Sequence, residues 1–241
     1  MAATLELKNV SFSFANQSKP FFRDLSVTFP AGALHFMRGQ NGAGKSTLFN
    51  VLRGLIHTQE KISGTMIFDG VQLSLNDNNA TSLNTLQKSI KLVQQNFDLM
   101  LADQLTFEEN LRAARFGLHP ELAGLPPLKP LPAFIDRFGI QYQKPVHLLS
   151  GGQRQALAIL MALQKPTKVL LLDEPTAALD AHNSKMIMEF LQLLVDENGL
   201  TVLIISHDPE LVQQHAKKHY YQFTMRDDGT RSVERVDQTK I

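Results

Sequence analysis

The sequence predicts an α/β fold with a parallel-sheet core, and the order of its hydrophobic patterns supports this. From Lys168 onward, short apolar segments alternate with segments whose apolar residues recur at helical spacing. This order is typical of parallel strands that are covered by helices on both faces. A strand, a glycine-rich loop and a helix follow one another within residues 33–55, and about 98–165 is predicted to be an inserted helical subdomain.

The first elements are predicted to be strands. Apolar and polar residues alternate from Leu5 to Phe14, and this is the periodicity of a strand. A second strand fits Leu25–Phe29, because the Pro-Ala-Gly sequence that follows it is typical of a turn. A third strand, Ala33–Arg38, runs directly into Gly39.

Helices are predicted where apolar residues share one face or where a cap is present. The helix after Gly44 has such a face, formed by Leu48, Val51, Leu52 and Leu55. Thr106–Phe116 opens with a Thr-x-x-Glu capping box, and Ala133–Phe138 and Gly151–Gln164 are also predicted to be helical. Five prolines make Pro120–Pro132 a predicted loop.

The last third of the chain contains the alternating units and ends in a predicted strand pair. The pair has an Asp-Asp-Gly turn at residues 227–229. In chain order these elements are strand Lys168–Leu172, helix Ser184–Val195, strand Thr201–Ser206, helix Glu210–Ala216 and the pair Tyr220–Val236.

The composition excludes several classes of protein. Lys and Arg number 24 against 23 Asp and Glu, so no bulk positive charge is available to attract nucleic acid. The absence of cysteine excludes disulfides, thiol catalysis and cysteine-ligated metals. The N-terminus lacks the pattern of a signal peptide, and no apolar run approaches the roughly 18 residues that a membrane span needs. We expect a cytoplasmic protein that would need another chain to cross a membrane.

A phosphate-binding loop is the most specific motif, because one segment matches G-x-x-x-x-G-K-[ST] in full. The segment is Gly39, Gln40, Asn41, Gly42, Ala43, Gly44, Lys45, Ser46 and Thr47. Its glycines let the backbone N–H groups and the helix N-terminus point at phosphates. Lys45 can reach the terminal phosphates, and the Ser46 hydroxyl can ligate Mg²⁺. A glycine-rich turn with a solvated lysine is the alternative, and the flanking strand and helix disfavour it.

Two further motifs have functional and structural interpretations. The strand Lys168–Leu172 ends in Asp173 and Glu174, at the edge where open α/β sheets bind ligands. Asp173 can hold Mg²⁺ and Glu174 can accept a proton from water, although an isolated acidic pair would more often be a surface or capping pair. In Leu149–Gln153, Ser-Gly-Gly opens a helix and makes a second anion site, or else an ordinary N-cap.

These motifs occur together and in order, and in this the sequence resembles the nucleotide-binding subunits of ATP-binding cassette (ABC) proteins, from about residue 4 to 225. Leu149–Gln153 is an unmodified copy of the family signature. Gln95 matches the glutamine loop, with Gln94 as the alternative, and Ala178–Asp180 and His207 match the two remaining motifs.

The resemblance also implies where the nucleotide base binds. Phe14 falls where the family has an aromatic residue that stacks on adenine, and Phe12 competes for that place. The family fold is a phosphate-loop NTPase with a parallel-sheet core, an N-terminal antiparallel β subdomain and an inserted helical subdomain. For this chain it implies one ABC ATPase domain over residues 1–241.

The resemblance implies ATP hydrolysis with Mg²⁺ as cofactor. Glu174 would deprotonate water, His207 would contact the γ-phosphate, and Lys45 would bind the phosphates. ATP would contact Phe14, residues 39–47, Gln95 and His207, and the metal would contact Ser46, Gln95 and Asp173. Residues of a second cassette would complete the site, namely its Ser150, Gly151, Gly152, Gln153 and Asp180.

The implied function is the energy-coupling subunit of an ABC membrane transporter. Its partners would be ATP, a second cassette in a homodimer or heterodimer, and separately encoded permease subunits, which roughly 95–132 would contact; nucleic acid is not expected. The chain would then lie at the cytoplasmic face of the membrane. A soluble ABC ATPase of the iron–sulfur assembly type is the alternative, and a generic phosphate-loop kinase is a third, disfavoured by the signature.

Overall fold

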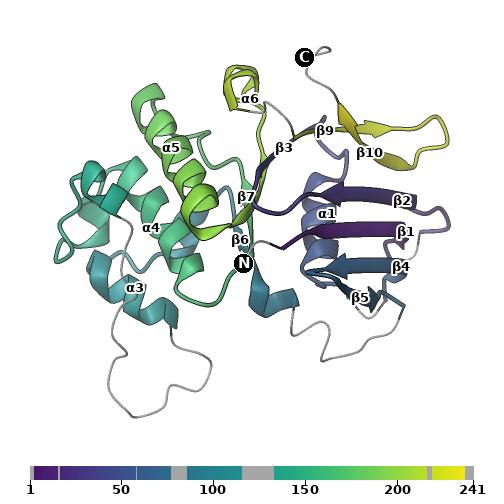
Figure 1. The fold of residues 1–241 in the computed structure, drawn as a ribbon, viewed down its shortest axis with the longest axis horizontal. Helices are drawn as coiled ribbons and strands as arrows, with labels where there is room; N and C mark the ends of the chain where they lie inside the picture. The colour runs from purple at the N-terminus through teal and green to yellow at the C-terminus, as the bar shows by residue number, and fades with distance from the viewer. Residues whose placement is uncertain are drawn as a thin grey trace, which may run out of the picture.

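The structure is a computed structural model that describes residues 3–15, 17–57, 59–76, 86–115, 133–215 and 219–236. The strands within these residues form one ten-stranded mixed sheet, in the order β5-β4-β1-β2-β10-β9-β3-β8-β7-β6 (Figure 1). The strands are β1 Leu5–Ser13, β2 Phe22–Phe29, β3 Leu34–Arg38, β4 Lys61–Phe68, β5 Val71–Ser74, β6 Ile90–Val93, β7 Val169–Asp173, β8 Thr201–Ile205, β9 Tyr220–Met225 and β10 Arg231–Val236.

One part of the sheet is the antiparallel N-terminal unit. β1 pairs antiparallel with β2 on one side and with β4 on the other, and β5 extends the sheet beyond β4. Leu5 lies opposite Phe29 and Phe68, so apolar side chains of adjacent strands meet on the buried face. The antiparallel β subdomain is therefore confirmed. Strands β4 and β5 were not among the predicted elements.

The other part is the parallel core, in which β3, β8, β7 and β6 pair side by side. Every residue of β8 is buried, as expected for a strand that is covered on both faces. β9 also pairs parallel with β3 and forms the predicted hairpin with β10. The carboxyl ends of β3, β7 and β8 therefore meet at one edge of the sheet, and this edge carries the motifs.

Helices cover both faces of this core. Alternate residues of β7 point to opposite sides: Leu170 and Leu172 join the apolar cluster with the α4 and α5 side chains, and Val169 and Leu171 join the cluster around α1. The described residues between β6 and β7 contain helices only, as the predicted insert requires (Figure 1). The helices are α1 Lys45–Leu52, η1 Phe97–Met100, α3 Phe107–Arg115, η2 Ala133–Phe138, η3 Val146–Leu148, α4 Gly151–Leu163, α5 Ala181–Asn198 and α6 Pro209–His215.

Some predicted bounds were wrong. α1 ends at Leu52, because Gly54 adopts a left-handed backbone, so Leu55 lies outside the helix and is 38% exposed. Ala133–Phe138 is a 3₁₀ helix, and α5 begins at Ala181 because the Asp180 side chain caps it. The predicted loop Pro120–Pro132 lies outside the described residues. None of the described helices combines the length and hydrophobicity of a membrane-spanning helix.

The fold carries a pH-sensitive group, since His35 is fully buried in β3 beside the rings of Phe29, His219 and Tyr221. Its Nε2 lies 2.8 Å from the Pro30 carbonyl oxygen. Burial lowers the His35 pKa to about 3 against the favourable Pro30 contact, and the charges of His219 and Arg235 add to the lowering. The folded protein therefore holds this imidazole neutral at neutral pH.

We expect the free energy of unfolding to fall as the pH is lowered from 6.5 toward about 3, because only the unfolded chain gains this proton in that range. The slope from this one group is at most about 1.4 kcal/mol per pH unit. Urea unfolding of wild type and His35→Phe at several pH values measures it. The variant should show a shallower pH dependence, whereas His182→Phe, at an exposed position, should not; equal slopes for all chains would refute the assignment.

Candidate functional site

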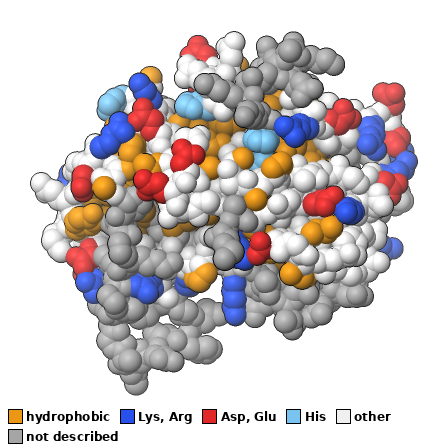
Figure 2. All heavy atoms as spheres, in the orientation of Figure 1, with side chains coloured by type: hydrophobic (Ala, Val, Ile, Leu, Met, Phe, Trp, Pro, Cys, Tyr) orange, Lys and Arg blue, Asp and Glu red, His pale blue; other side chains and the backbone are white. Residues whose placement is uncertain are grey.

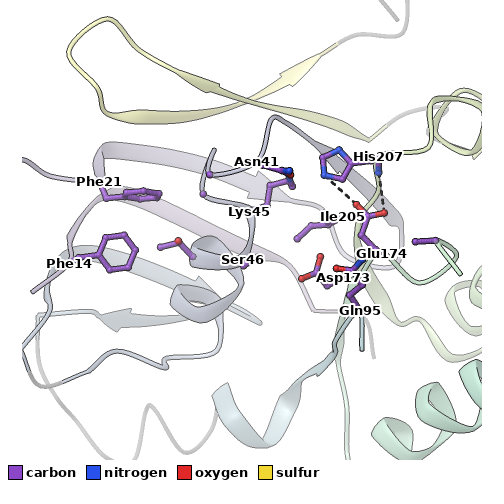
Figure 3. A pocket seen from close by; sticks show the side chains of 14 residues that line it. Phe14, Phe21, Asn41, Lys45, Ser46, Gln95, Asp173, Glu174, Ile205 and His207 are labelled. Carbon is purple, nitrogen blue, oxygen red and sulfur yellow. Dashed lines mark hydrogen bonds and ion pairs between the residues drawn. The ribbon is translucent and has the colours of Figure 1, made fainter. Parts of the chain in front are cut away.

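A cavity of about 700 Å³ opens at the carboxyl edge of the parallel strands (Figure 3). It brings together side chains from the phosphate loop, the ends of β7 and β8, the segment after β6 and the β1–β2 connection. Its walls are formed by Phe14, Phe21, Asn41, Gly42, Gly44, Lys45, Ser46, Thr47, Gln95, Asp173, Glu174, Ala177, Ile205 and His207. Most residues predicted to act within one chain are therefore gathered in one place.

The phosphate loop forms one wall through its backbone and Lys45. Gly44 has a φ of +103°, and a Cβ at this position would lie 2.8 Å from Phe21 Cε1, so glycine is required for both conformation and space. Lys45 is buried, and its Nζ donates to the carbonyl oxygens of Gly39 (2.6 Å) and Gln40 (3.1 Å). Gly39 and Gln40 do not line the cavity themselves, but they orient the cation that does.

The acidic pair lies across the cavity from the loop, at the end of β7. Asp173 pairs with Ile205 of β8, and the backbone N–H of Glu174 donates to the Ile205 carbonyl oxygen at 3.0 Å. Glu174 has a φ of +52°, a left-handed backbone that is strained for a residue with a side chain. The turn at Glu174 thus directs its carboxylate out of the sheet and into the cavity (Figure 3).

His207 contacts Glu174 in two ways. The backbone N–H of His207 donates to Glu174 Oε2 at 3.2 Å, and His207 Nε2 lies 3.5 Å from Glu174 Oε1 (Figure 3). Oε1 is buried and accepts no hydrogen bond from the described part of the chain. One carboxylate oxygen is therefore fixed, and the other can accept a proton.

Burial controls the electrostatics of the cavity. It raises the pKa of Asp173 and that of Glu174, although Lys45 and His207 act in the opposite direction. It lowers the pKa of Lys45, and here the two carboxylates oppose the shift. A cation and two anions thus share a poorly solvated space, in which each charge acts strongly on a bound group.

The far end of the cavity is aromatic. Phe14 and Phe21 meet nearly at right angles, with ring centroids 4.9 Å apart, and both line the cavity. Phe12 is 2% exposed and belongs to the core, so Phe14 is the ring of the two candidates that reaches the cavity. Phe21 was missed by the sequence interpretation, although its neighbourhood of alternating phenylalanines offered a signal. The guanidinium of Arg231 lies 4.4 Å from the Phe21 ring centroid.

Oxygen ligands for a metal ion are grouped in the same cavity. Ser46, Gln95 and Asp173 all line it, whereas Gln94 does not. Hydroxyl, amide and carboxylate oxygens form the donor set that Mg²⁺ prefers, so the residues fit that ion. The described residues contain no group of three His, Asp or Glu side chains that could hold a metal ion. Such a metal would therefore need phosphate oxygens as further ligands.

The residues predicted to act on a second cassette do not line this cavity. Ser150 and Gln153 form a reciprocal capping box at the start of α4, with bonds of 3.3 and 3.0 Å. A Cβ at Gly152 would overlap the Asn183 side chain, so glycine is required where α4 meets α5. Asp180 accepts a hydrogen bond from the Asn183 backbone at 2.8 Å. The predicted trans residues therefore form a second, contiguous group.

Comparisons with known proteins agree with this arrangement. A family model described as ABC transporter matches residues 22–177. The phosphonates import ATP-binding protein PhnC 2 of Oceanobacillus iheyensis is 33% identical over 224 residues, which cover 89% of this chain and 84% of that protein. The methionine import ATP-binding protein MetN of Clostridium acetobutylicum is 32% identical over 209 residues, 87% of this chain. This chain spans only 62% of that longer relative.

Solved structures give the same family. CbiO1 from Clostridium perfringens, part of the ABC transporter complex cbiONQ, has a TM-score of 0.74 and 27% identity over 95% of this chain and 86% of that one. A dimeric post-hydrolysis state of the cassette MJ0796, bound to ADP and Pi, has a TM-score of 0.67 and 25% identity, covering 96% and 97% of the two chains. The predicted phosphate-loop NTPase fold is confirmed.

The aromatic end of the cavity yields a test of which ring contacts the base. Phe14→Ala should weaken ATP binding by about 1–3 kcal/mol, on the scale of base–aromatic stacking in nucleic-acid complexes, and Phe14→Tyr should not. Equilibrium binding of ATP and of tripolyphosphate separates this effect from the phosphate loop, because only ATP should lose affinity. Phe12→Ala is the control, and should lower stability by opening a core cavity. ATP affinity lost at Phe12 and kept at Phe14 would reverse the choice.

Proposed function

The chain belongs to the ABC transporter family and is an ATPase of that family, and we propose that it is the energy-coupling subunit of a membrane importer. The observation that carries the proposal is the cavity, where phosphate loop, acidic pair and histidine converge. The names of the curated relatives, which are import ATP-binding proteins, favour transport over the assembly alternative and support import. Relatives with different named cargoes are similarly identical to this chain, so identity selects no cargo.

In the proposed reaction, the phosphate loop and Lys45 hold the triphosphate and stabilise charge on the transferred phosphoryl group. Mg²⁺, held by Ser46, Gln95 and Asp173 together with phosphate oxygens, would add positive charge there. Glu174 accepts the proton of the attacking water, and burial raises its pKa toward the working pH, which favours this role. His207 contacts the γ-phosphate and keeps the Glu174 carboxylate oriented through its backbone N–H.

We further propose a head-to-tail dimer in which each ATP lies between the phosphate loop of one chain and Ser150–Gly152 of the other. The support is geometric: the α4 N-terminus is a separate anion site that does not line its own chain's cavity. The dimeric structure of the related cassette MJ0796 is consistent with it. Residues 1–241 would form one ATPase domain, with about 98–165 as its helical subdomain.

The permease would bind beside the glutamine loop, at the cytoplasmic face of the membrane. Three exposed leucines support this, because Leu99, Leu105 and Leu148 are 80%, 38% and 55% exposed on η1, η3 and the segment between η1 and α3. Exposed apolar residues of this size favour a protein partner. On the face drawn in Figure 2, acidic and basic side chains are interspersed, so that face offers no basic surface to nucleic acid.

Glu174→Gln tests the catalytic assignment. The variant keeps the shape of the side chain but loses the proton acceptor, so ATP hydrolysis should fall by about 10²–10⁴-fold while ATP binding persists. Sizing chromatography with Mg²⁺ and ATP should then show a stable dimer that wild type forms only transiently. Asp173→Asn is the comparison, and should impair Mg²⁺–ATP binding as well as turnover. Near-normal hydrolysis by Glu174→Gln would refute the base.

Mixing two inactive chains tests the composite site. Lys45→Ala removes the cation from one phosphate loop, and Ser150→Arg blocks the anion site of the other chain. Each alone should hydrolyse ATP poorly, but a heterodimer contains one site with an intact loop and an intact Ser150. Activity should therefore reappear on mixing and follow the heterodimer fraction. If mixing restores nothing although heterodimers form, the trans arrangement is wrong.

A further inference from the structure

The glutamine loop and the signature helix are joined by an ion pair in the structure. Asp98 lies on η1, three residues after Gln95, and Arg154 lies on α4, four residues after Ser150. Arg154 Nη2 lies 2.5 Å from Asp98 Oδ1. The Arg154 backbone N–H also donates to the Ser150 carbonyl oxygen at 2.9 Å, so Arg154 is one helical turn away from the anion site. Each partner is therefore directly attached to a residue of one nucleotide-binding element.

The surrounding contacts make this pair the main polar link between η1 and α4. Phe97, Met100 and Leu101 pack against the apolar cluster that α4 helps to form, and such contacts are not directional. Gln155, the next residue of α4, is fully buried, but neither of its amide atoms bonds to the described residues. Gln155 therefore gives η1 no hydrogen bond, and the charged pair defines the relative position of η1 and α4.

We infer that Asp98 and Arg154 are positioning residues that transmit the state of Gln95 in one nucleotide site to Ser150–Gly152, which completes the other. When Gln95 engages the γ-phosphate side of ATP, η1 moves with it, and the ion pair carries α4 along. This inference rests on the proposed function, because it needs ATP in the cavity and Ser150 as an anion ligand. The pair lies beside exposed Leu99, so a permease bound there would act on the same link.

The ion pair contributes little to folding, and this makes the role testable. The Asp98 side chain is 47% exposed and that of Arg154 26% exposed, and pairs exposed to this degree stabilise proteins only slightly. Asp98→Asn should therefore fold normally and bind nucleotide normally. The Arg137–Glu189 pair offers a matched control, because it joins η2 to α5 at 2.7 Å with comparable exposure and touches neither η1 nor α4's first turn.

The experiment measures amide hydrogen exchange in the first turns of α4, at residues 150–157. The full chain is kept dilute enough to be monomeric by sizing, with Mg²⁺ and either ADP or the β,γ-imido analogue of ATP. In wild type the exchange rates should differ between the two nucleotides by about fivefold or more, the usual size of such coupling. Asp98→Asn should abolish this difference without changing either nucleotide affinity. The double variant Asp98→Arg with Arg154→Asp should restore it, and Glu189→Gln should leave it intact.

The inference is overturned if wild type shows no difference between the nucleotides, or if Asp98→Asn retains it. It is also overturned if the reversed pair fails to restore the difference, or if Glu189→Gln loses it equally, because either result would indicate a general structural effect. The proposed function fails separately, by a different measurement: if wild type binds neither nucleotide, the cavity is not an ATP site and the inference falls with it.

Discussion

The register between β7 and β8 is the constraint on which the site depends. Asp173 pairs with Ile205, and the backbone of Glu174 bonds to the same residue, so the chain reaches Glu174 and His207 at adjacent points of one sheet edge. A slip of one residue would exchange the faces of both strands and separate the carboxylate from the histidine. The continuous burial of β8 prevents such a slip, since helices cover both of its faces. A packing requirement of the core thereby fixes the distances of the chemistry.

The same arrangement sets the charge balance of the cavity. Burial alone would discharge Lys45 and protonate the carboxylates, yet each group opposes the shift of the other. Lys45 also bonds to two carbonyl oxygens of its own loop, which hold the cation in place. Fixed charges of this kind need little reorganisation when a phosphate arrives, and this is the main contribution that a protein makes to phosphoryl transfer.

The sequence predicted the core elements whose apolar runs are long or continuous, and the motifs that follow them directly. It missed β4, where Gly64 and polar residues interrupt the pattern, and β6, which has only four residues. Phe12 and Phe14 could not be separated by alternation, because both fall on the same face; Phe12 lies in paired β1, and Phe14 lies just beyond its end. Phe21 and the Asp98–Arg154 pair depend on contacts between distant segments, and local patterns do not contain that information.

The left-handed backbone of Glu174 has a consequence for how this protein can be improved. A side chain in that conformation costs of the order of 1–3 kcal/mol, and glycine would adopt it without strain. A search for heat-resistant variants would therefore find glycine attractive at residue 174, and would remove the carboxylate in doing so. Thermal tolerance and turnover compete at this one residue, so stabilising substitutions should be sought in the surface helices, where no such exchange is made.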